Sequence, residues 1–395
     1  MFKSLINFCD IIFQSCVTEF KLFFKDKAAY VSFLGTSVVV VFLYSSIYGH
    51  ETLQKLPVAI VDQDNSTASR ELVRMVDATQ GVLIYKNAPS LIDARKLFFQ
   101  EEVRGILYIP KDFSKKLQRG QAANVSAYCD ASYMLYYKSF LNGLSKALGT
   151  FNAQLEISNI VRRGTDIRNA VFQRRPVNPQ SIALFNPYAG YATFIMPVVC
   201  LLILQATLLT AIGIIGGTKK EYNAINKNRG EGIPFNPFPA LIGRSLNYLF
   251  LSILLMLIIL GFCFTLFRLP QRGHLLELLV FLTPYFLSIV FMGIALAALF
   301  RKREDVLFVI PFISLPAIFL TGTSWPTVAI PGYLQYISYI FPTTVGVKGF
   351  LCLTQFGASL SEIKDIWRQM WLTCLIYFII ALVAEIRVHK KLSLI

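Results

Sequence analysis

The chain has 395 residues, of which 55% are hydrophobic and 15% charged, and its formal charge is +15 at pH 7. Soluble domains carry about a quarter charged residues, so this composition excludes an ordinary soluble domain and indicates a membrane protein. Many basic residues lie in short segments beside apolar runs, and they form no basic face with interleaved aromatic residues. A nucleic-acid partner is therefore not expected.

Residues 1–27 predict an amphipathic helix that lies on the inner face of the membrane. Apolar residues recur at steps of three and four from Phe2 to Phe24, with Lys, Asp and Glu between them. A helix in the core of a cytoplasmic domain would show the same period and is the alternative interpretation. Charged residues interrupt the apolar ones throughout, which argues against a cleavable signal sequence.

Six apolar segments are suited to cross about 30 Å of hydrocarbon as helices. They cover residues 28–48, 191–215, 245–267, 275–300, 306–322 and 367–386. The fifth is short and contains Pro311 and Pro316, so we expect a kinked helix packed among others. The predicted fold class is an α-helical polytopic membrane protein with six transmembrane helices, the last five of them within residues 189–395.

The distribution of Lys and Arg predicts the orientation of these helices. With the N-terminus inside, fifteen basic residues fall in the inner segments and five in the short outer ones. The inner segments are 1–27, 216–244, 301–305 and 387–395, and the outer ones are 268–274 and 323–368. This bias places both termini in the cytoplasm.

Residues 49–188 form a polar region between the first and second spans, where we expect a small α/β domain outside the cytoplasm. Strand patterns lie at 57–62, 81–85, 104–110 and 124–130, and helix patterns lie between them at 69–78 and 90–102. Such alternation favours an α/β layer structure.

A long helix follows over residues 132–163. Its apolar residues step by three and four: Met134, Tyr137, Leu141, Leu144, Leu148, Phe151 and Leu155. Such a stripe has to be buried, either on the sheet of the same domain or against a second copy or a partner protein.

The segment "DQDNST", Asp62 to Thr67, places two carboxylates at the end of a strand, where they could hold a metal ion or form an aspartyl phosphate. A calcium loop needs Gly at its sixth position, which is Thr67 here. We therefore interpret the segment as a turn followed by a helix cap from Asp64, Asn65 or Ser66.

No enzyme active site is predicted. The chain has no GxxxxGK[ST] sequence for ATP and no GxSxG, its three histidines lie far apart, and its seven cysteines include no CxxC pair. We expect no metal site and no cofactor bound by this chain.

The predicted spans are nearly free of ionisable residues but contain some neutral polar ones: Gln205, Thr207, Thr210, Asn247, Thr283 and Ser288. These side chains can form hydrogen bonds between helices. Alternatively, Gln205, Thr207 and Asn247 could line a path for an amphipathic or apolar substrate.

Several stretches together resemble the permease subunits of ATP-binding-cassette type-2 exporters with a large extracytoplasmic domain. "EFKLFFKDKAAYVSFLG" (19–35) is similar to the entry segment of that family, and "FNPYAGYATFIMPVV" (185–199) to the approach to its second span. "VAIVDQDNSTASRELV" (58–73) is the most specific match, because it resembles the first strand and helix of the outer domain. The resemblance covers essentially the whole chain.

The resemblance implies a re-entrant element over residues 323–350, which forms an extracellular gate near the exit of the substrate. The positions that match are Trp325, Pro326, Pro331, Leu334, Gln335 and Pro342. Irregular backbone at membrane depth has to be surrounded by protein or by a water-filled cavity, and aromatic side chains suit the membrane interface.

The resemblance also implies that the N-terminal helix, with Glu19 and Asp26, and the cytoplasmic loop 217–244 contact the ATPase. The family has an acidic–basic pair followed by Gly-Thr and Glu, whereas here Gly-Thr precedes "KKEY". The coupling role is therefore carried over only to the region that contains Lys219, Lys220, Glu221, Tyr222, Arg229 and Glu231.

The expected function is that of an export permease in the inner membrane of a bacterium. Its partners are an ABC ATPase that binds ATP and Mg²⁺, a second permease copy or paralogue, membrane lipid and, in a Gram-negative host, a periplasmic adaptor. The alternative is a membrane anchor or receptor whose outer domain binds a ligand or partner without transport. A proton-driven pump is a third interpretation, but the spans lack the buried carboxylates that such pumps use.

Overall fold

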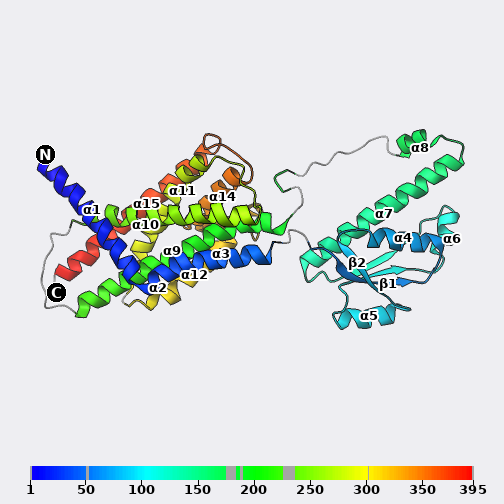
Figure 1. Cartoon of the computed structure of the whole chain (residues 1–395), viewed down its shortest axis with the longest axis horizontal. Coiled ribbons are helices and arrows are strands. Elements are labelled where there is room, and N and C mark those ends of the chain that lie inside the picture. Colours follow the sequence, from blue (N-terminus) through cyan, green and yellow to red (C-terminus); the bar gives the residue numbers. More distant parts are fainter. Residues whose placement is uncertain are drawn as a thin grey trace. The chain divides into compact units, whose positions relative to one another are not determined.

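The chain folds into two compact units (Figure 1). The helical unit consists of residues 1–49 and 184–395, and the α/β unit of residues 50–183. The computed structural model describes residues 2–49, 53–174, 184–186, 190–225, 236–300 and 302–393.

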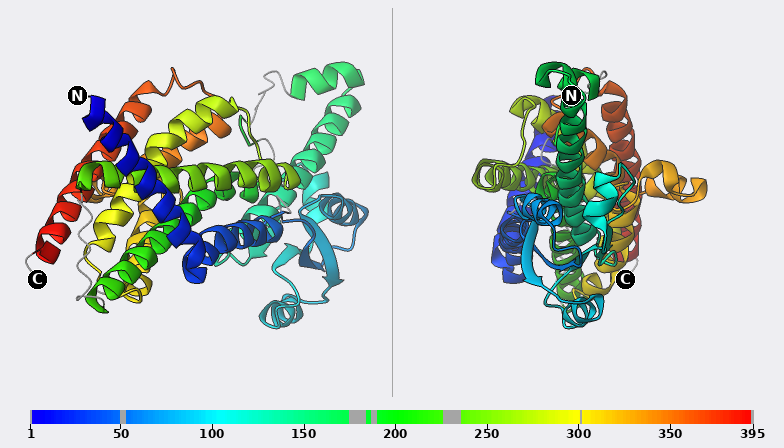
Figure 2. Two further views of the ribbon diagram at one scale, coloured as in Figure 1. Left: turned by 60° about the vertical axis from the view of Figure 1, so that its left-hand side comes forward. Right: turned by 90° about the vertical axis from the view of Figure 1, so that its right-hand side faces the viewer.

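The helical unit contains nearly all of the apolar helices. Its elements are α1 (Phe2–Lys25), α2 (Lys27–Tyr30), the π-helical η1 (Val31–Gly35), α3 (Thr36–Ile47), α9 (Tyr191–Ile225), α10 (Pro237–Ile258), the π-helical η2 (Ile259–Phe264), α11 (Leu275–Ala297), α12 (Asp305–Leu320), η3 (Thr327–Ala329), α13 (Gly332–Ser338), α14 (Pro342–Thr354) and α15 (Lys364–Ser393). The start of α1, the end of α9 and the end of α15 lie at the same end of this unit, which we call the terminal end (Figures 1 and 2).

Five helices of the described chain are long and apolar enough to cross a membrane. They are Lys27–Ile47, Tyr191–Glu221, Pro237–Phe264, Leu275–Ala297 and Lys364–Val388. The prediction of a polytopic helical membrane protein is therefore confirmed. The fifth predicted span, 306–322, forms α12, whose 16 residues extend about 24 Å and are shorter than a hydrocarbon core of about 30 Å.

The predicted re-entrant region contains a bent helix pair. Helices α13 and α14 meet at an angle of 86°, and together they are long and apolar enough to form one broken span or a re-entrant loop. Pro342 occupies the first turn of α14, where the missing N–H of proline has no helical partner to lose.

The expected loop 217–244 is largely helical where the structure describes it. Helix α9 continues to Ile225, and α10 begins at Pro237. The side chain of Asn236 caps α10 by accepting a hydrogen bond from the N–H of Phe238. The hydrophobic pattern ends near residue 216, but polar side chains beyond it find partners on other helices. Tertiary contacts therefore extend the helix past its apolar segment.

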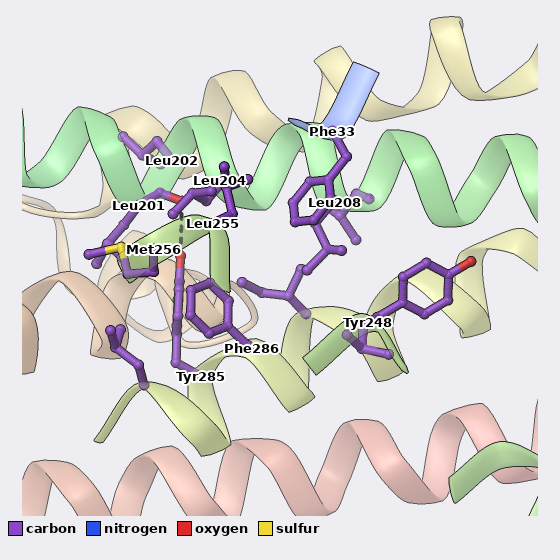
Figure 3. Packing of buried hydrophobic residues seen from close by; sticks show 14 of the residues in the cluster. Phe33, Leu201, Leu202, Leu204, Leu208, Tyr248, Leu255, Met256, Tyr285 and Phe286 are labelled. Carbon is purple, nitrogen blue, oxygen red and sulfur yellow. Dashed lines mark hydrogen bonds between the residues drawn. The ribbon is translucent and has the colours of Figure 1, made fainter. Parts of the chain in front are cut away.

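The centre of the helical unit is formed by α9 and α11, which are mostly buried, whereas α15 keeps most of its apolar surface exposed. Figure 3 shows Phe33, Leu201, Leu208 and Phe286 packed in this core, and the hydroxyl of Tyr285 directed at the α9 backbone. An outer helix with an exposed apolar face is expected where lipid surrounds the protein.

The α/β unit contains a four-stranded sheet in the order β2-β1-β3-β4, with three parallel strands and an antiparallel β4. Its elements are β1 (Leu56–Asp62), α4 (Thr67–Asp77), β2 (Val82–Asn87), α5 (Leu91–Phe99), β3 (Gly105–Ile109), α6 (Phe113–Gln118), β4 (Ser126–Cys129), α7 (Met134–Arg162) and α8 (Ile167–Arg174). All strands and helices predicted for this region are present, and α6 and α8 are additional.

Helices cover both faces of this sheet. Side chains of β1 that include Val58 and Ile60 pack with α4 and α7, while Ala59 and Val61 pack with α5. The chain moves from β1 to β2 in one direction and from β2 to β3 in the other, so two crossovers of the same hand place their helices on opposite faces.

The apolar stripe predicted on α7 is divided in the structure. Leu144 and Phe151 are buried against the sheet, whereas Met134, Tyr137 and Leu141 are exposed. The residue that continues the buried stripe toward the start of the helix is Phe140, which lies four residues before Leu144, as Leu144 lies seven before Phe151. The second half of the predicted stripe therefore packs on the sheet of its own unit.

The "DQDNST" segment forms a turn and a helix cap. One carboxylate oxygen of Asp62 accepts hydrogen bonds from the N–H groups of Asp64 and Asn65, both at 3.0 Å. Ser66 and Ser69 form a reciprocal capping box at the start of α4. These bonds agree with the interpretation as a turn and cap.

Candidate functional site

A group of charged side chains lies at the terminal end of the helical unit, and we call it the terminal charge network. It connects α1, the end of α9, the start of α10, the turn between α11 and α12, and the end of α15. Its acidic and basic members are Glu19, Asp26, Lys219, Lys220, Glu221, Arg244, Arg303 and Glu385.

Glu19 is the buried centre of this network. Its side chain belongs to α1 and only 4% of the residue is exposed. One carboxylate oxygen forms an ion pair with Lys219 of α9, and the other accepts a hydrogen bond from the hydroxyl of Tyr248 of α10 at 2.9 Å. Burial alone raises the pKa of Glu19, but the positive charges of Lys219 and Arg244 outweigh this effect and hold the pKa below its ordinary value.

A second buried ion pair connects α10 to α15. Arg244 and Glu385 are 2.8 Å apart, and both side chains are largely buried. Arg244 also acts electrostatically on Glu19. The start of α10 therefore contacts an acidic group on each side of it, one from α1 and one from α15.

Asp26 marks the break between α1 and α2. Its carboxylate caps α2 by accepting from the N–H groups of Ala28 at 3.0 Å and Ala29 at 3.4 Å. The same carboxylate lies 3.4 Å from Arg303 and accepts from the hydroxyl of Thr218 at 3.4 Å. Asp26 thus connects the entry into the first span with α9 and with the turn that precedes α12.

Lys220 and Glu221 bind the chain between α11 and α12. The ammonium of Lys220 donates to the carbonyl oxygens of Ala297, Ala298 and Phe300 at the end of α11, as a cation at a helix C-terminus is expected to do. The carboxylate of Glu221 accepts from the N–H of Arg303 at 3.0 Å.

The structure brings together most of the residues predicted for coupling. Glu19, Asp26, Lys219, Lys220 and Glu221 all belong to the network. The side chain of Tyr222, and Arg229 and Glu231 as whole residues, lie outside the part of the chain that the structure describes.

Sequence reasoning missed Arg244, Tyr248, Arg303 and Glu385. Arg244 and Glu385 carried a signal, because they are opposite charges at the ends of two apolar segments that the sequence analysis assigns to the same side of the membrane. Their pairing could not be read from the sequence, since it requires α10 and α15 to be neighbours at that depth.

Of the polar residues in the spans, Thr207 has well-defined partners. Its hydroxyl lies 2.7 Å from that of Ser37 on α3 and also donates to the carbonyl of Ile203. This geometry is that of a helix–helix hydrogen bond. The hydroxyls of Thr210, Thr283 and Ser288 donate to carbonyls within their own helices.

Gln205 and Asn247 differ from these hydroxyl residues. Gln205 is 0% exposed and Asn247 is 2% exposed. Within the described chain, the amide oxygen and the amide nitrogen of the Gln205 side chain both lack a hydrogen-bond partner. The amide nitrogen of Asn247 lacks one as well.

The six residues predicted for the gate lie on or beside the bent pair. Pro326 precedes η3, Pro331 precedes α13, and Pro342 starts α14. The side-chain amide of Gln335 donates to the carbonyls of Thr327 and Ile330 at 2.9 and 2.8 Å, which fixes the chain before α13. Leu334 is half-buried on α13, while Trp325 is largely exposed before η3.

The apolar helices and the bent pair define a polytopic membrane protein with a charged terminal end. The chain matches the family described as ABC-2 family transporter protein over residues 27–383. It therefore belongs to the ABC-2 family, whose members are permeases with transmembrane helices that work with ABC ATPase partners and usually form dimers.

Three curated relatives show similarity along most of the chain. One is the "Probable multidrug ABC transporter permease YbhR" of Escherichia coli (strain K12), 21% identical over 80% of this chain and 81% of the relative. Another is the "Linearmycin resistance permease protein LnrN" of Bacillus subtilis (strain 168), 21% identical over 90% of this chain and 94% of the relative. The "ABC transporter G family member 20" of Dictyostelium discoideum is 21% identical over 98% of this chain and 51% of the relative.

Proposed function

We propose that the chain is the membrane subunit of an ATP-driven exporter in the cytoplasmic membrane of a bacterium. It moves an amphipathic or apolar substrate outward. A separate ABC ATPase binds ATP with Mg²⁺ and drives this transport, and a second permease, identical or paralogous, completes the pathway. The family membership supports the division of labour between permease and ATPase.

The buried position of Glu19 is the observation that carries this proposal. Glu19 connects α1 to α9 and α10 through Lys219 and Tyr248, so a displacement of α1 has to move the ends of two membrane helices or break a buried ion pair. Breaking such a pair is costly in a low-dielectric environment. An ATPase that contacts α1 and the segment after α9 is thereby coupled to the spans.

The orientation in this proposal has the terminal charge network on the cytoplasmic side and the α/β unit outside. The excess of Lys and Arg in the segments of the terminal end supports it. One face of α1 packs on α10, and Phe13 and Phe20 are exposed on another, which suits contact with the lipid of the inner leaflet. A periplasmic adaptor is a further partner for the α/β unit in a Gram-negative host.

The bent pair α13–α14 forms the extracellular gate in this proposal. Its connection bends by 86°, and Trp325, Tyr333 and Tyr336 around it are exposed, as aromatic residues at a membrane interface are. The names of two relatives, multidrug ABC transporter permease and linearmycin resistance permease, support the export of a drug-like substrate by this chain.

The test is an affinity purification of the full chain in mild detergent, with ATP hydrolysis measured in the eluate. We expect an ABC ATPase in stoichiometric amount. A clean preparation without ATPase subunit or activity would instead favour the membrane anchor or receptor.

Variants of the network connect this test to the structure. Glu19→Gln and Asp26→Asn should reduce transport per ATP hydrolysed or release the ATPase. Glu71→Gln, which removes an exposed carboxylate paired within α4, is the matched control and should leave both unchanged. If all three variants show the same transport per ATP hydrolysed and retain the same amount of ATPase, the network has no coupling role.

A further inference from the structure

Among the buried polar side chains of the helical unit that lack hydrogen-bond partners within the described chain, two are completely enclosed. They are Gln205 of α9, through both its amide oxygen and its amide nitrogen, and Thr343 of α14, through its hydroxyl. Both residues are 0% exposed. An unpaired buried polar group costs about 1–3 kcal/mol, and hydrocarbon offers no water to replace the partner. Such groups require an explanation.

Gln205 and Thr343 lie at the same depth because α9 and α14 pack against each other in opposite directions. The side-chain amide of Gln355 donates to the carbonyl of Thr193, which fixes the register of the two helices. The sequence distance from Thr193 to Gln205 equals that from Gln355 to Thr343. Since α-helices rise by the same amount per residue, Gln205 and Thr343 are level. Gln205 is near the middle of the span Tyr191–Glu221.

The region where α9 and α14 pack against each other, which we call the seam, also contacts Tyr285 of α11. Its hydroxyl donates to the carbonyl of Leu201 at 3.1 Å, as Figure 3 shows, and a Cβ atom at Gly346 would lie 2.4 Å from its ring. Gln205 is one helical turn beyond Leu201, and Thr343 is one turn before Gly346. Residues three and four apart share a helix face, so both side chains are on the faces of α9 and α14 that meet at α11.

The N-terminus of α14 lies at the same place. Thr343 is the second residue of this helix of 13 residues, and Pro342 before it is buried. Phe341 precedes the helix and no side chain caps its start. A helix N-terminus carries partial positive charge and N–H groups that bind oxygen acceptors. The bend between α13 and α14 thus places an uncapped helix start inside the protein, beside two unpaired side chains.

We propose that the start of α14, the hydroxyl of Thr343 and the amide of Gln205 form a subsite for a neutral oxygen-bearing group of the transported molecule. An amide or ester carbonyl and an alcohol are the groups that fit, because Gln205 offers both a donor and an acceptor. This inference rests on the proposed transport function. The ligand enters when α14 moves away from α9, since both side chains are enclosed in the present arrangement.

The surrounding charges select a neutral group. The described residues of α9 from Tyr191 to Gly217 and of α11 after Glu277 include no Asp, Glu, Lys or Arg. Lys348 is on α14, but its side chain is exposed and does not lie in the seam. A full charge would therefore have no counter-ion at this depth, and its burial would cost more than a helix dipole returns.

Photolabelling of the purified full chain in lipid nanodiscs tests this subsite. The probes are a long-chain primary amide with a diazirine in its chain and a hydrocarbon of the same length with the same diazirine. We expect the amide to label the α9 and α14 peptides around Gln205 and Thr343 about tenfold more than the hydrocarbon does, as one to two net hydrogen bonds predict. The double variant Gln205→Leu with Thr343→Val should remove this excess.

Two controls sharpen the result. Thr343→Ser keeps the hydroxyl and should keep the excess, and so should Ser252→Ala, which removes a buried hydroxyl of α10 that is already bonded to the carbonyl of Tyr248. Equal labelling by both probes, or an excess that survives in the double variant, overturns the proposal.

Stability provides a second readout on the same samples. If Gln205 and Thr343 serve a ligand, Gln205→Leu and Thr343→Val remove unpaired groups and should each raise the melting temperature by about 2–4 °C. If the two side chains instead stabilise the folded chain, both variants melt at lower temperature, which contradicts the proposal. The affinity purification separates the two hypotheses: an ATPase partner without amide-specific labelling refutes the subsite only, whereas absence of the ATPase refutes the transport function.

Discussion

Glu19 is a carboxylate that is removed from water almost completely and stays ionised because of its partners. Lys219 and Arg244 supply positive charge, and Tyr248 donates a hydrogen bond. A buried ion pair adds little net stability compared with apolar residues, but removal of one partner leaves the others unpaired. The role of Glu19 is therefore to hold α1 in one position relative to α9 and α10.

Replacement of Glu19 by Gln should lower the free energy of unfolding by about 2–3 kcal/mol, because Lys219 loses its anionic partner and Arg244 loses a nearby negative charge. The measurement is thermal unfolding of the purified chain in detergent. Glu71→Gln on the exposed surface of α4 should change it by less than about 0.5 kcal/mol. Equal effects of the two substitutions would show that the buried pair does not hold the fold.

The contribution of Glu19 should depend on pH. Its pKa in the folded chain lies below the ordinary value of 4.5, so folding favours the ionised form. The stabilisation is fully present above pH 4.5 and is lost as the pH falls through the lower pKa of the folded state. Melting curves of the wild type and of Glu19→Gln should therefore differ at pH 7 and converge as the pH decreases below 4.5. A constant difference over this range would contradict the assignment.

At the scale of elements, the backbone at the end of α9 lies directly against the backbone between α11 and α12. A Cβ atom at Gly217 would lie 2.6 Å from the Cα atom of Arg303, so no side chain fits there. This close approach allows Lys220 and Glu221, in the next turn, to reach the end of α11 and the N–H of Arg303.

Gly217→Ala should destabilise the chain by about 1–3 kcal/mol, because backbone atoms have to move apart to accommodate the methyl group. It should also weaken the response of ATP hydrolysis to the permease, since the network contacts depend on this approach. Gly261→Ala in η2 is the control, because a Cβ atom there meets nothing within 4 Å. Unchanged melting of Gly217→Ala would show that α9 and the turn are not tightly packed.

A proline inside α9 explains the buried Gln355. Pro197 has no N–H, so the carbonyl of Thr193 four residues earlier loses its helical donor. The side-chain amide of Gln355, at the end of α14, donates to this carbonyl instead. In hydrocarbon such a replacement is needed, because no water can bond to the carbonyl.

The effect of Gln355→Leu should therefore depend on Pro197. In the wild-type background we expect a loss of about 1–3 kcal/mol, because a buried carbonyl loses its donor. In a Pro197→Ala background the helix supplies its own N–H, and the loss should fall below half of that value. Melting temperatures of the four proteins of this double-mutant cycle measure the coupling. Equal losses in both backgrounds would contradict the explanation.

At the scale of the whole molecule, the two units have separate hydrophobic cores. The α/β unit surrounds its sheet with α4, α6 and α7 on one face and α5 on the other. A fragment of residues 53–174 should therefore fold alone as a soluble domain. Circular dichroism should show mixed helix and strand with one cooperative thermal transition. A fragment that is unfolded or aggregated would show that the unit depends on the helical unit.

The sequence was sufficient for features that depend on neighbouring residues. Hydropathy identified the apolar helices, and the alternation of periods two and 3.6 identified the strands and main helices of the α/β unit. It failed where distant contacts override local preference. Helix α9 extends to Ile225 because its polar end is bound by other helices, and the buried face of α7 begins at Phe140 because the sheet lies on that side.

The membrane class, the order of elements and the resemblance to ABC-2 permeases were all readable from the chain, since they follow from local periodicity and composition. The partners of the buried polar groups were not. Glu19 and Lys219 are 200 residues apart, and Gln355 and Thr193 are 162 apart. Such pairs form only when packing sets which helices are neighbours and at what depth, because burial in a low-dielectric core makes an unpaired polar group costly.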